Sequence, residues 1–167
     1  NPELYPQDNA ASIDTEVDAT TGWASAEGGT LATDPDADTG VVALKSTSFS
    51  IRAGINFDLN SILTVGLLYN ITARMKSDGT GAGDGAWNLG LGNENNSQTI
   101  FIGTVRNEDS QYKDASIFTY ERKAAVDERY LILREANVEH DGGALLDTIS
   151  IKEIEAGATT IDIADGA

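Results

Sequence analysis

The sequence predicts an all-β protein, a β-sandwich of the jelly-roll type with two antiparallel sheets. Apolar and polar residues alternate with a period of two along several stretches, which is typical of half-buried strands. The 17 glycines punctuate these stretches, and long apolar helix patterns are missing. A length of 167 residues with 40% hydrophobic residues suits one domain around one core.

The predicted strands can be followed in order along the chain. Val42 and Leu44 mark a short one. In residues 51–59 and 69–76 every second residue is apolar, so each of these strands turns one face toward the core. A loop rich in Gly and Asp, residues 77–85, follows the second of them and predicts a chain reversal.

Strand patterns continue toward the C-terminus. Trp87, Leu89 and Leu91 alternate with Asn and Gly residues. Further strands are predicted at residues 99–106, 115–120, 129–134 and 145–154. Weak helical turns are predicted at residues 59–67 and 123–128. Strands at these spacings are typical of sandwiches and jelly rolls.

This pattern divides the chain into two segments. We expect residues 1–155 to form the jelly-roll domain and residues 156–167 to form a tail or linker, whose Thr-Thr-Ile-Asp-Ile pattern could make an extra strand. Residues 1–9 have no positively charged start and no apolar run, so they do not read as a signal peptide. The sequence leaves open whether the chain is a processed form or a piece of a larger protein.

Charge and composition exclude several classes of function. With 27 acidic and 11 basic residues the formal net charge is −16, which repels nucleic acid and anionic membranes. No apolar stretch is long enough to span a membrane. Cysteine is absent, which removes thiol catalysis, and the single histidine, His140, lies in a predicted turn. Since no nucleophile elbow or phosphate loop is found either, we do not expect an enzyme.

Four stretches, in this order, resemble carbohydrate-binding modules of families 4, 9 and 22, which are β-jelly rolls. They are Asp14-Thr15-Glu16 with Gly22-Trp23, then Gly40 to Lys45, Tyr69 to Lys76, and Leu146 to Ile151. The resemblance spans residues 14–154. It implies a secreted or cell-surface protein that binds a polysaccharide or oligosaccharide without catalysis.

Two calcium sites are predicted. Asp34, Asp36 and Asp38 place carboxylates at alternate positions of one loop, and Ca²⁺ prefers several oxygen ligands; the alternative is a solvated acidic turn. The resemblance implies a different, structural Ca²⁺ held by Glu16 and Asp147. Asp147 lies in phase with apolar neighbours, so it should point toward the core and need a cation or hydrogen bonds.

Sugars bind through planar polar side chains that grip hydroxyl groups and through flat aromatic faces. Opposite the core, Arg74 and Asn88 are candidates for such contacts, and Arg134 is expected to join them. The alternative for Arg74 is a solvated or ion-paired residue. Gly90 and Gly92, beside Asn88, are expected to leave a groove open for a ligand.

Three aromatic residues are candidate sugar platforms. Trp23 lies in a Gly-rich segment and is either an edge platform or a lid over the core. Trp87 shares the phase of its apolar neighbours, which favours the core. Tyr112 lies in a polar stretch, which favours an exposed stacking residue.

These features predict a non-catalytic polysaccharide-binding module with a structural calcium ion. Two other functions remain open. One is a structural subunit of an extracellular filament, surface layer or virion, which would self-assemble by adding the tail as a strand to a neighbour's sheet edge. The other is a calcium-dependent adhesin module. The fold alone does not separate these roles.

Overall fold

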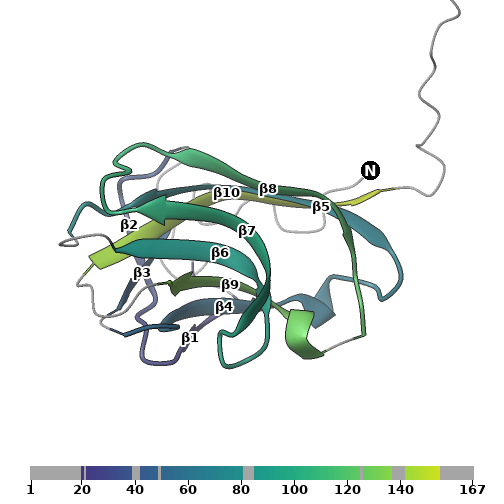
Figure 1. Cartoon of the computed structure of the whole chain (residues 1–167). Helices are drawn as coiled ribbons and strands as arrows, with labels where there is room; N and C mark the ends of the chain where they lie inside the picture. The colour runs from purple at the N-terminus through teal and green to yellow at the C-terminus, as the bar shows by residue number, and fades with distance from the viewer. Residues whose placement is uncertain are drawn as a thin grey trace, which may run out of the picture.

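The computed structural model describes residues 20, 22–38, 42–48, 50–80, 85–124, 126–136 and 142–154. Within them, ten strands form two five-stranded antiparallel sheets that face each other, which confirms the predicted β-sandwich (Figure 1). Two short 3-10 helices, η1 (Leu59–Ser61) and η2 (Val126–Glu128), match the places where helical turns were predicted.

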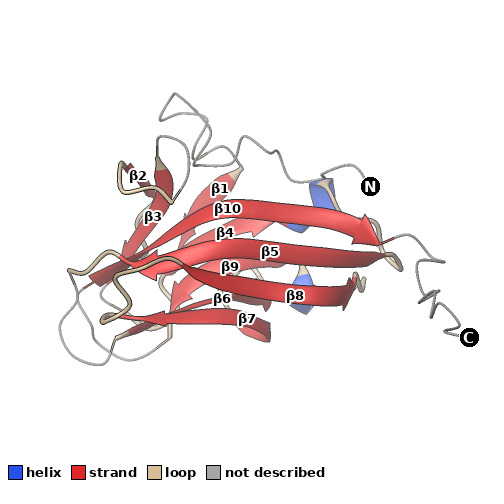
Figure 2. Cartoon of the chain, turned by 90° about the horizontal axis from the view of Figure 1, so that it is seen from above, coloured by secondary structure: helices blue, strands red, loops and turns tan. Residues whose placement is uncertain are grey.

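We call the two layers sheet I and sheet II. Sheet I has the strand order β1 (Trp23–Ala26), β4 (Gly54–Asp58), β9 (Tyr130–Glu135), β6 (Ala86–Gly92) and β7 (Gln98–Arg106). Sheet II has the order β2 (Ala32–Asp34), β3 (Ala43–Ser48), β10 (Gly142–Ile154), β5 (Leu68–Ser77) and β8 (Lys113–Glu121). Figure 2 shows the long strands of sheet II lying over sheet I.

The core lies between the sheets and follows the alternation of the sequence. In β5, Tyr69, Ile71 and Met75 are at most 1% exposed, and Leu89 and Leu133 of sheet I pack opposite them in the same cluster. Over most of its length, β5 thus buries every second side chain and turns the others outward. This arrangement leaves two outer faces, one for each sheet, on which polar side chains gather.

One predicted strand begins later than expected. The alternation suggested a strand from residue 51, but β4 begins at Gly54, and Ile51 is 45% exposed in the preceding turn. Arg52 has a φ of 71°, in the left-handed region that a strand cannot use. The turn therefore breaks the strand pattern before Ala53, which is buried.

None of the helices in the described part of the chain is both long and apolar enough to span a membrane. The tail, residues 156–167, and the turn that contains His140 lie outside the described residues.

Candidate functional site

The outer face of sheet I is built from three rows of residues that lie opposite one another across β4, β9, β6 and β7. The rows are Gly54–Arg134–Asn88–Thr104, Asn56–Ile132–Gly90–Phe101 and Asp58–Tyr130–Gly92–Gln98. Directly opposed residues of antiparallel strands point to the same side of the sheet. We call this surface the sheet I face.

Gln98 is fixed in the middle of the sheet I face. Its Nε2 donates to the carbonyl oxygens of Asn88 and Ile132, both at 3.1 Å. Its Oε1 accepts from Nε of Arg134 at 3.0 Å. The Gln98 side chain lies over Gly90, where an added Cβ would come within 3.1 Å of it. The groove predicted over Gly90 is therefore partly filled by this amide.

Arg134 and Asn88 are direct register partners on this face. The Oδ1 of Asn88 and the hydroxyl of Thr104 share a hydrogen bond of 2.6 Å, which fixes the amide plane and points Nδ2 away from Thr104. Burial, followed by the charge of Arg52, lowers the pKa of Arg134. The structure thus brings two of the predicted ligand residues side by side.

Two aromatic side chains that the sequence analysis did not select lie on the same face. Phe101 is 60% exposed and lies opposite Gly90. Tyr130 lies opposite Gly92, and the guanidinium carbon of Arg129 is 5.1 Å from the centre of its ring. Arg129 is held by the carboxylate of Asp58, to which its Nε donates at 3.0 and 3.1 Å.

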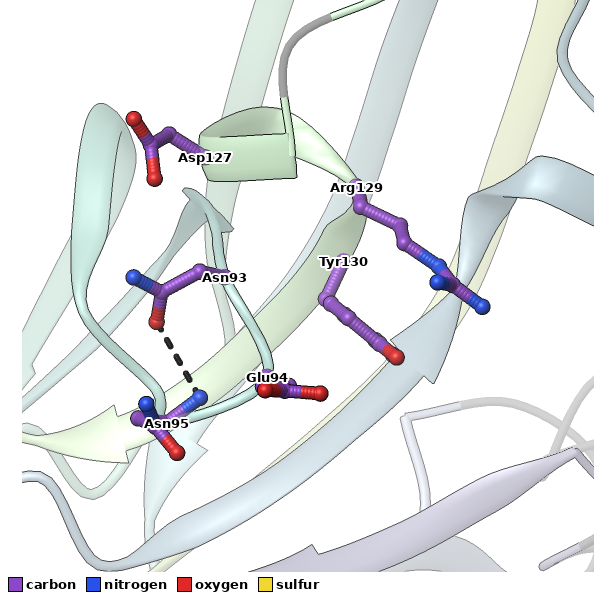
Figure 3. A pocket seen from close by; sticks show the side chains of 6 residues that line it. All are labelled: Asn93, Glu94, Asn95, Asp127, Arg129 and Tyr130. Atoms are coloured by element: carbon purple, nitrogen blue, oxygen red, sulfur yellow. Dashed lines mark hydrogen bonds between the residues drawn. The ribbon is translucent and has the colours of Figure 1, made fainter.

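A pocket of about 250 Å³ extends the sheet I face beyond Tyr130 (Figure 3). It is lined by Asn93, Glu94, Asn95, Asp127, Arg129 and Tyr130. The backbone N–H of Asn95 donates to Oδ1 of Asn93 at 3.1 Å, which holds the turn between β6 and β7. An aromatic ring beside amide and carboxylate groups is a combination that can bind a polyhydroxylated ligand.

The two tryptophans do not belong to this surface. Trp23 is 6% exposed and its ring centre lies 5.7 Å from that of Phe57, so it closes the core. Trp87 is 2% exposed within the core cluster. Trp87 thus lies in the core, as its phase favoured, and Trp23 is the lid rather than the edge platform. Neither is exposed as a sugar platform, because each side chain lies on the inward phase of its strand.

Arg74 and Tyr112 lie on the outer face of sheet II, away from Asn88 and Arg134. Nε of Arg74 donates to Asp38 at 3.0 Å, and Nη1 donates to Asp114 at 2.9 Å. The hydroxyl of Tyr112 donates to the carbonyl of Asp36 at 2.8 Å. Burial raises the pKa of Tyr112, and the surrounding carboxylates raise it further. Both side chains are therefore engaged within the protein.

The acidic loop lies against the same face of sheet II. Its three carboxylates pair with basic side chains, Asp34 with Lys45, Asp36 with Lys76, and Asp38 with Arg74. The ammonium of Lys76 is also 4.9 Å from the centre of the Tyr112 ring. Among the described residues, no three His, Cys, Asp or Glu side chains are grouped to hold a metal ion. The hollow here, about 370 Å³, is thus lined by ion pairs.

Asp147 is fully buried, but it does not point toward the core as predicted. It lies opposite Arg74 on the outer face of sheet II, beneath the acidic loop, because the register of β10 shifts between Asp147 and Ser150 and reverses the phase of the strand. Its Oδ2 accepts from the backbone N–H of Asp38 at 2.8 Å, and its Oδ1 accepts from that of Thr148 at 2.6 Å. A buried carboxylate held by backbone donors fits a position beside a cation as well as a purely structural role. Glu16, the other predicted ligand, lies outside the described residues.

Comparison with known proteins gives the fold but not a sequence family. No protein-family model matches the chain, and no curated protein matches it in sequence. Among solved structures, the tandem CBM22-1–CBM22-2 domain of Xyn10C from Paenibacillus barcinonensis matches with a TM-score of 0.66 and 16% identity. The match covers 93% of this chain and 47% of that one, so the chain spans about half of the tandem.

Two further structures are similar over nearly their whole length. A xylan-binding domain of family CBM 22 matches with a TM-score of 0.65 and 15% identity, over 92% of this chain and 96% of that one. A cyclase from Fischerella sp. TAU matches with a TM-score of 0.55 and 13% identity, over 93% and 99%. The resemblance predicted from the four sequence stretches is thus confirmed at the level of the fold, which is shared by binding modules and by an enzyme.

Proposed function

We propose that the chain is a non-catalytic module that binds a polysaccharide on the sheet I face. The observation that carries this proposal is the exposure of Phe101, which leaves 60% of an aromatic residue in solvent beside Gly90 on the sheet I face. Exposed aromatic rings provide a flat apolar surface for sugars. The side-chain amides of Asn88 and of the pocket residues Asn93 and Asn95 can form hydrogen bonds with sugar hydroxyl groups. The fold of xylan-binding domains supports the same function.

The dimensions of the face suit an extended chain rather than a single sugar. Tyr130 and Arg134 lie four residues apart on one side of β9, which corresponds to about 13 Å. The pocket beyond Tyr130 adds length in the same direction. Because Ile132 in the middle of β9 is fully buried, a polysaccharide would pass beside it, contacting Arg134 and Asn88 first, then Phe101 on β7, and finally Tyr130 and the pocket. Such a partner places the protein outside the cell.

Affinity electrophoresis through gels that contain soluble polysaccharides, xylan among them, tests this function. We expect retardation of the native chain by at least one polymer. Phe101→Ala should weaken it about tenfold, equal to about 1.4 kcal/mol, because the ring no longer contacts the sugar. Val65→Ala is the matched control, since Val65 is 55% exposed but lies in the turn after η1. Free migration on every polymer would reject the function.

A structural calcium ion bound by Glu16 and Asp147 is part of the same proposal. When bound, the ion would neutralise the buried carboxylate of Asp147 and cross-link β10 to the N-terminal segment. Calcium should then raise the melting temperature of the native chain relative to chelator, and Glu16→Gln should reduce that increase. Equal melting temperatures with calcium and with chelator would exclude the ion.

A further inference from the structure

The basic side chains of this acidic protein are not all matched by carboxylates. Acidic residues outnumber basic residues by 27 to 11. Five basic residues form ion pairs within the described part of the chain: Lys45, Arg74, Lys76, Lys113 and Arg129. Arg52, Arg106, Arg122, Lys123 and Arg134 form none with a described residue, although surplus carboxylates are abundant, and of these Arg134 lies within the sheet I face. An unpaired arginine on such a surface needs an explanation.

Arg134 is positioned to present its guanidinium to a ligand. Gln98 accepts from its Nε at 3.0 Å and is itself held by two backbone carbonyls, so the orientation of the guanidinium plane is fixed. This contact leaves the two Nη groups of Arg134 without a described protein acceptor. The carboxylate next to it in sequence, Glu135, is 1% exposed and accepts a hydrogen bond from Ser48 inside the sandwich at 2.7 Å.

Asn88 supplies a third donor at the same place. It is the register partner of Arg134, and its Oδ1 is taken by the Thr104 hydroxyl at 2.6 Å. Its Nδ2 therefore faces the same side of the sheet as the Nη groups of Arg134. Among the described residues, no acceptor binds Nδ2 of Asn88 or the Nη groups of Arg134, and such free donors favour an anionic oxygen group over a cation.

Arg52 adds a second positive charge beside this site. Its backbone N–H donates to the carbonyl of Glu135 at 3.1 Å, and the amide of Asn96 donates to its carbonyl at 3.0 Å. These bonds hold Arg52 in its left-handed conformation, with a φ of 71°, next to the end of β9. The positive charge of Arg52 contributes to lowering the pKa of Arg134, and a bound anion would offset this repulsion.

From this geometry we propose that the ligand is an acidic polysaccharide, and that Arg134 and Asn88 bind the carboxylate of a uronic acid residue. The planar fork of an arginine matches a carboxylate in a way that a neutral sugar hydroxyl does not. The proposal rests on the polysaccharide-binding function proposed above and specifies its substrate class. It also explains why a strongly acidic protein keeps an arginine without an ion pair on its ligand face.

The test compares polymers that differ only in charge. The probes are glucuronoxylan and polygalacturonan, each beside its carboxyl-reduced form, in which the carboxylates have become neutral hydroxymethyl groups. By isothermal titration calorimetry, the native chain should bind at least one acidic polymer about tenfold more tightly than its reduced form. The preference should shrink as the salt concentration rises, because the charge contact is partly exposed to solvent.

Substitutions separate this inference from the general function. Arg134→Gln should abolish the preference for the acidic form over the reduced form, whereas Phe101→Ala should weaken binding of both forms and keep the preference. Lys123→Gln, which removes an exposed charge at the end of β8, is the charge-matched control and should keep the preference. Circular dichroism confirms that each variant is folded.

The outcomes distinguish the two claims. Equal binding of acidic and reduced polymers, or a preference that survives Arg134→Gln, would overturn the carboxylate site while leaving polysaccharide binding intact. Tighter binding of a sulfated polymer with a neutral backbone would assign the anionic group to sulfate instead. Absence of binding to all polymers would overturn both proposals.

Discussion

The outer faces of the two sheets differ in how completely their basic side chains are paired with carboxylates. On sheet II, Lys45 lies 3.0 Å from Asp34 and 3.2 Å from Asp78, and Arg74 is paired with two more carboxylates. On the sheet I face, Arg129 is paired with Asp58, but Arg134 contacts only an amide, and Phe101 lies in solvent. Ion pairs satisfy the first surface internally, while the second keeps donors and apolar area available.

This difference suggests where to look for a ligand site: at the arginine without an ion pair on sheet I rather than at the paired carboxylates of the acidic loop. The acidic loop attracted attention in the sequence because its carboxylates are concentrated, but paired charges have little left to offer a ligand. The isolated arginine of sheet I attracted less attention, because one basic residue in a strand has no pattern. A charge without a partner points to function more directly than a cluster of charges does.

The largest effect expected on the paired surface comes from Asp78→Ala. The Asp78 side chain is 2% exposed, accepts from the backbone N–H of Gly143 at 3.1 Å, and pairs with Lys45. Removing this buried carboxylate leaves the N–H groups of Gly143 and Thr80 without their acceptor, while Lys45 keeps its pair with Asp34, so the free energy of unfolding in urea should fall by about 2 kcal/mol. Asp114→Ala, at a carboxylate whose side chain is 81% exposed, should cost under about 0.5 kcal/mol.

Polysaccharide binding by Asp78→Ala should stay at the native level at temperatures where the variant is folded. A loss of binding in the folded variant would show that the two faces are not independent.

The second-largest effect is expected from acid, which should lower the stability that the ion pairs of sheet II contribute. Burial tends to raise the pKa of Asp78, but hydrogen bonds from Thr80 and Lys45 outweigh it and lower the pKa overall; Asp34 is lowered in the same way by the Asp36 N–H and Lys45. A lowered pKa in the folded state stabilises the protein above the unfolded value of about 3.9, and this stability is lost as pH falls through the folded pKa.

The melting temperature should therefore be nearly constant from pH 7 to about pH 5 and fall below about pH 4. Scanning calorimetry across this range measures the effect, and Asp78→Ala should show a shallower fall. An unchanged melting temperature down to pH 2 would mean that these ion pairs do not contribute to stability.

The smallest effect is expected from Arg74→Gln. This substitution removes two ion pairs of a side chain that is 34% exposed, so the free energy of unfolding should fall by less than about 1 kcal/mol. Binding of every polysaccharide should be unchanged. Weaker polysaccharide binding by this variant in isothermal titration calorimetry would place the ligand site on sheet II. Arg74 would then be a ligand-binding residue, as the sequence predicted.

Most of the fold could be predicted from the sequence because period-two alternation is long and regular where a strand has one buried face. The phases of β5 and β6 are confirmed by the burial of Tyr69, Ile71, Trp87 and Leu89. β1 and β2 were not predicted, since strands of four and three residues are too short to show a period.

The candidate site was only partly predictable. Arg74 and Asn88 were expected on neighbouring strands of one surface, because their strands are consecutive in sequence. The structure places β5 in sheet II and β6 in sheet I, so these residues lie on opposite outer faces. The pairing of Asn88 with Arg134 depends on strand order, which alternation does not contain.

Phe101 was missed for a local reason. Residues 100–102 are all apolar, so alternation could not decide which of them faces outward. In the structure, the register of β7 against β6 shifts between Leu89 and Gly90, which turns Phe101 outward while Ile102 is 8% exposed. An extra residue in one strand changes the direction of its side chains, and this feature leaves no reliable mark in a sequence.

The same register shifts have a consequence for the behaviour of the protein in concentrated solution. β7 forms the edge of sheet I, and its pairing with β6 is shifted at two places, again between Leu91 and Gly92. Irregular edges twist out of line and make poor templates for a strand from another molecule. An apolar residue as exposed as Phe101 can thus be kept at a sheet border with a low tendency toward fibrous aggregation.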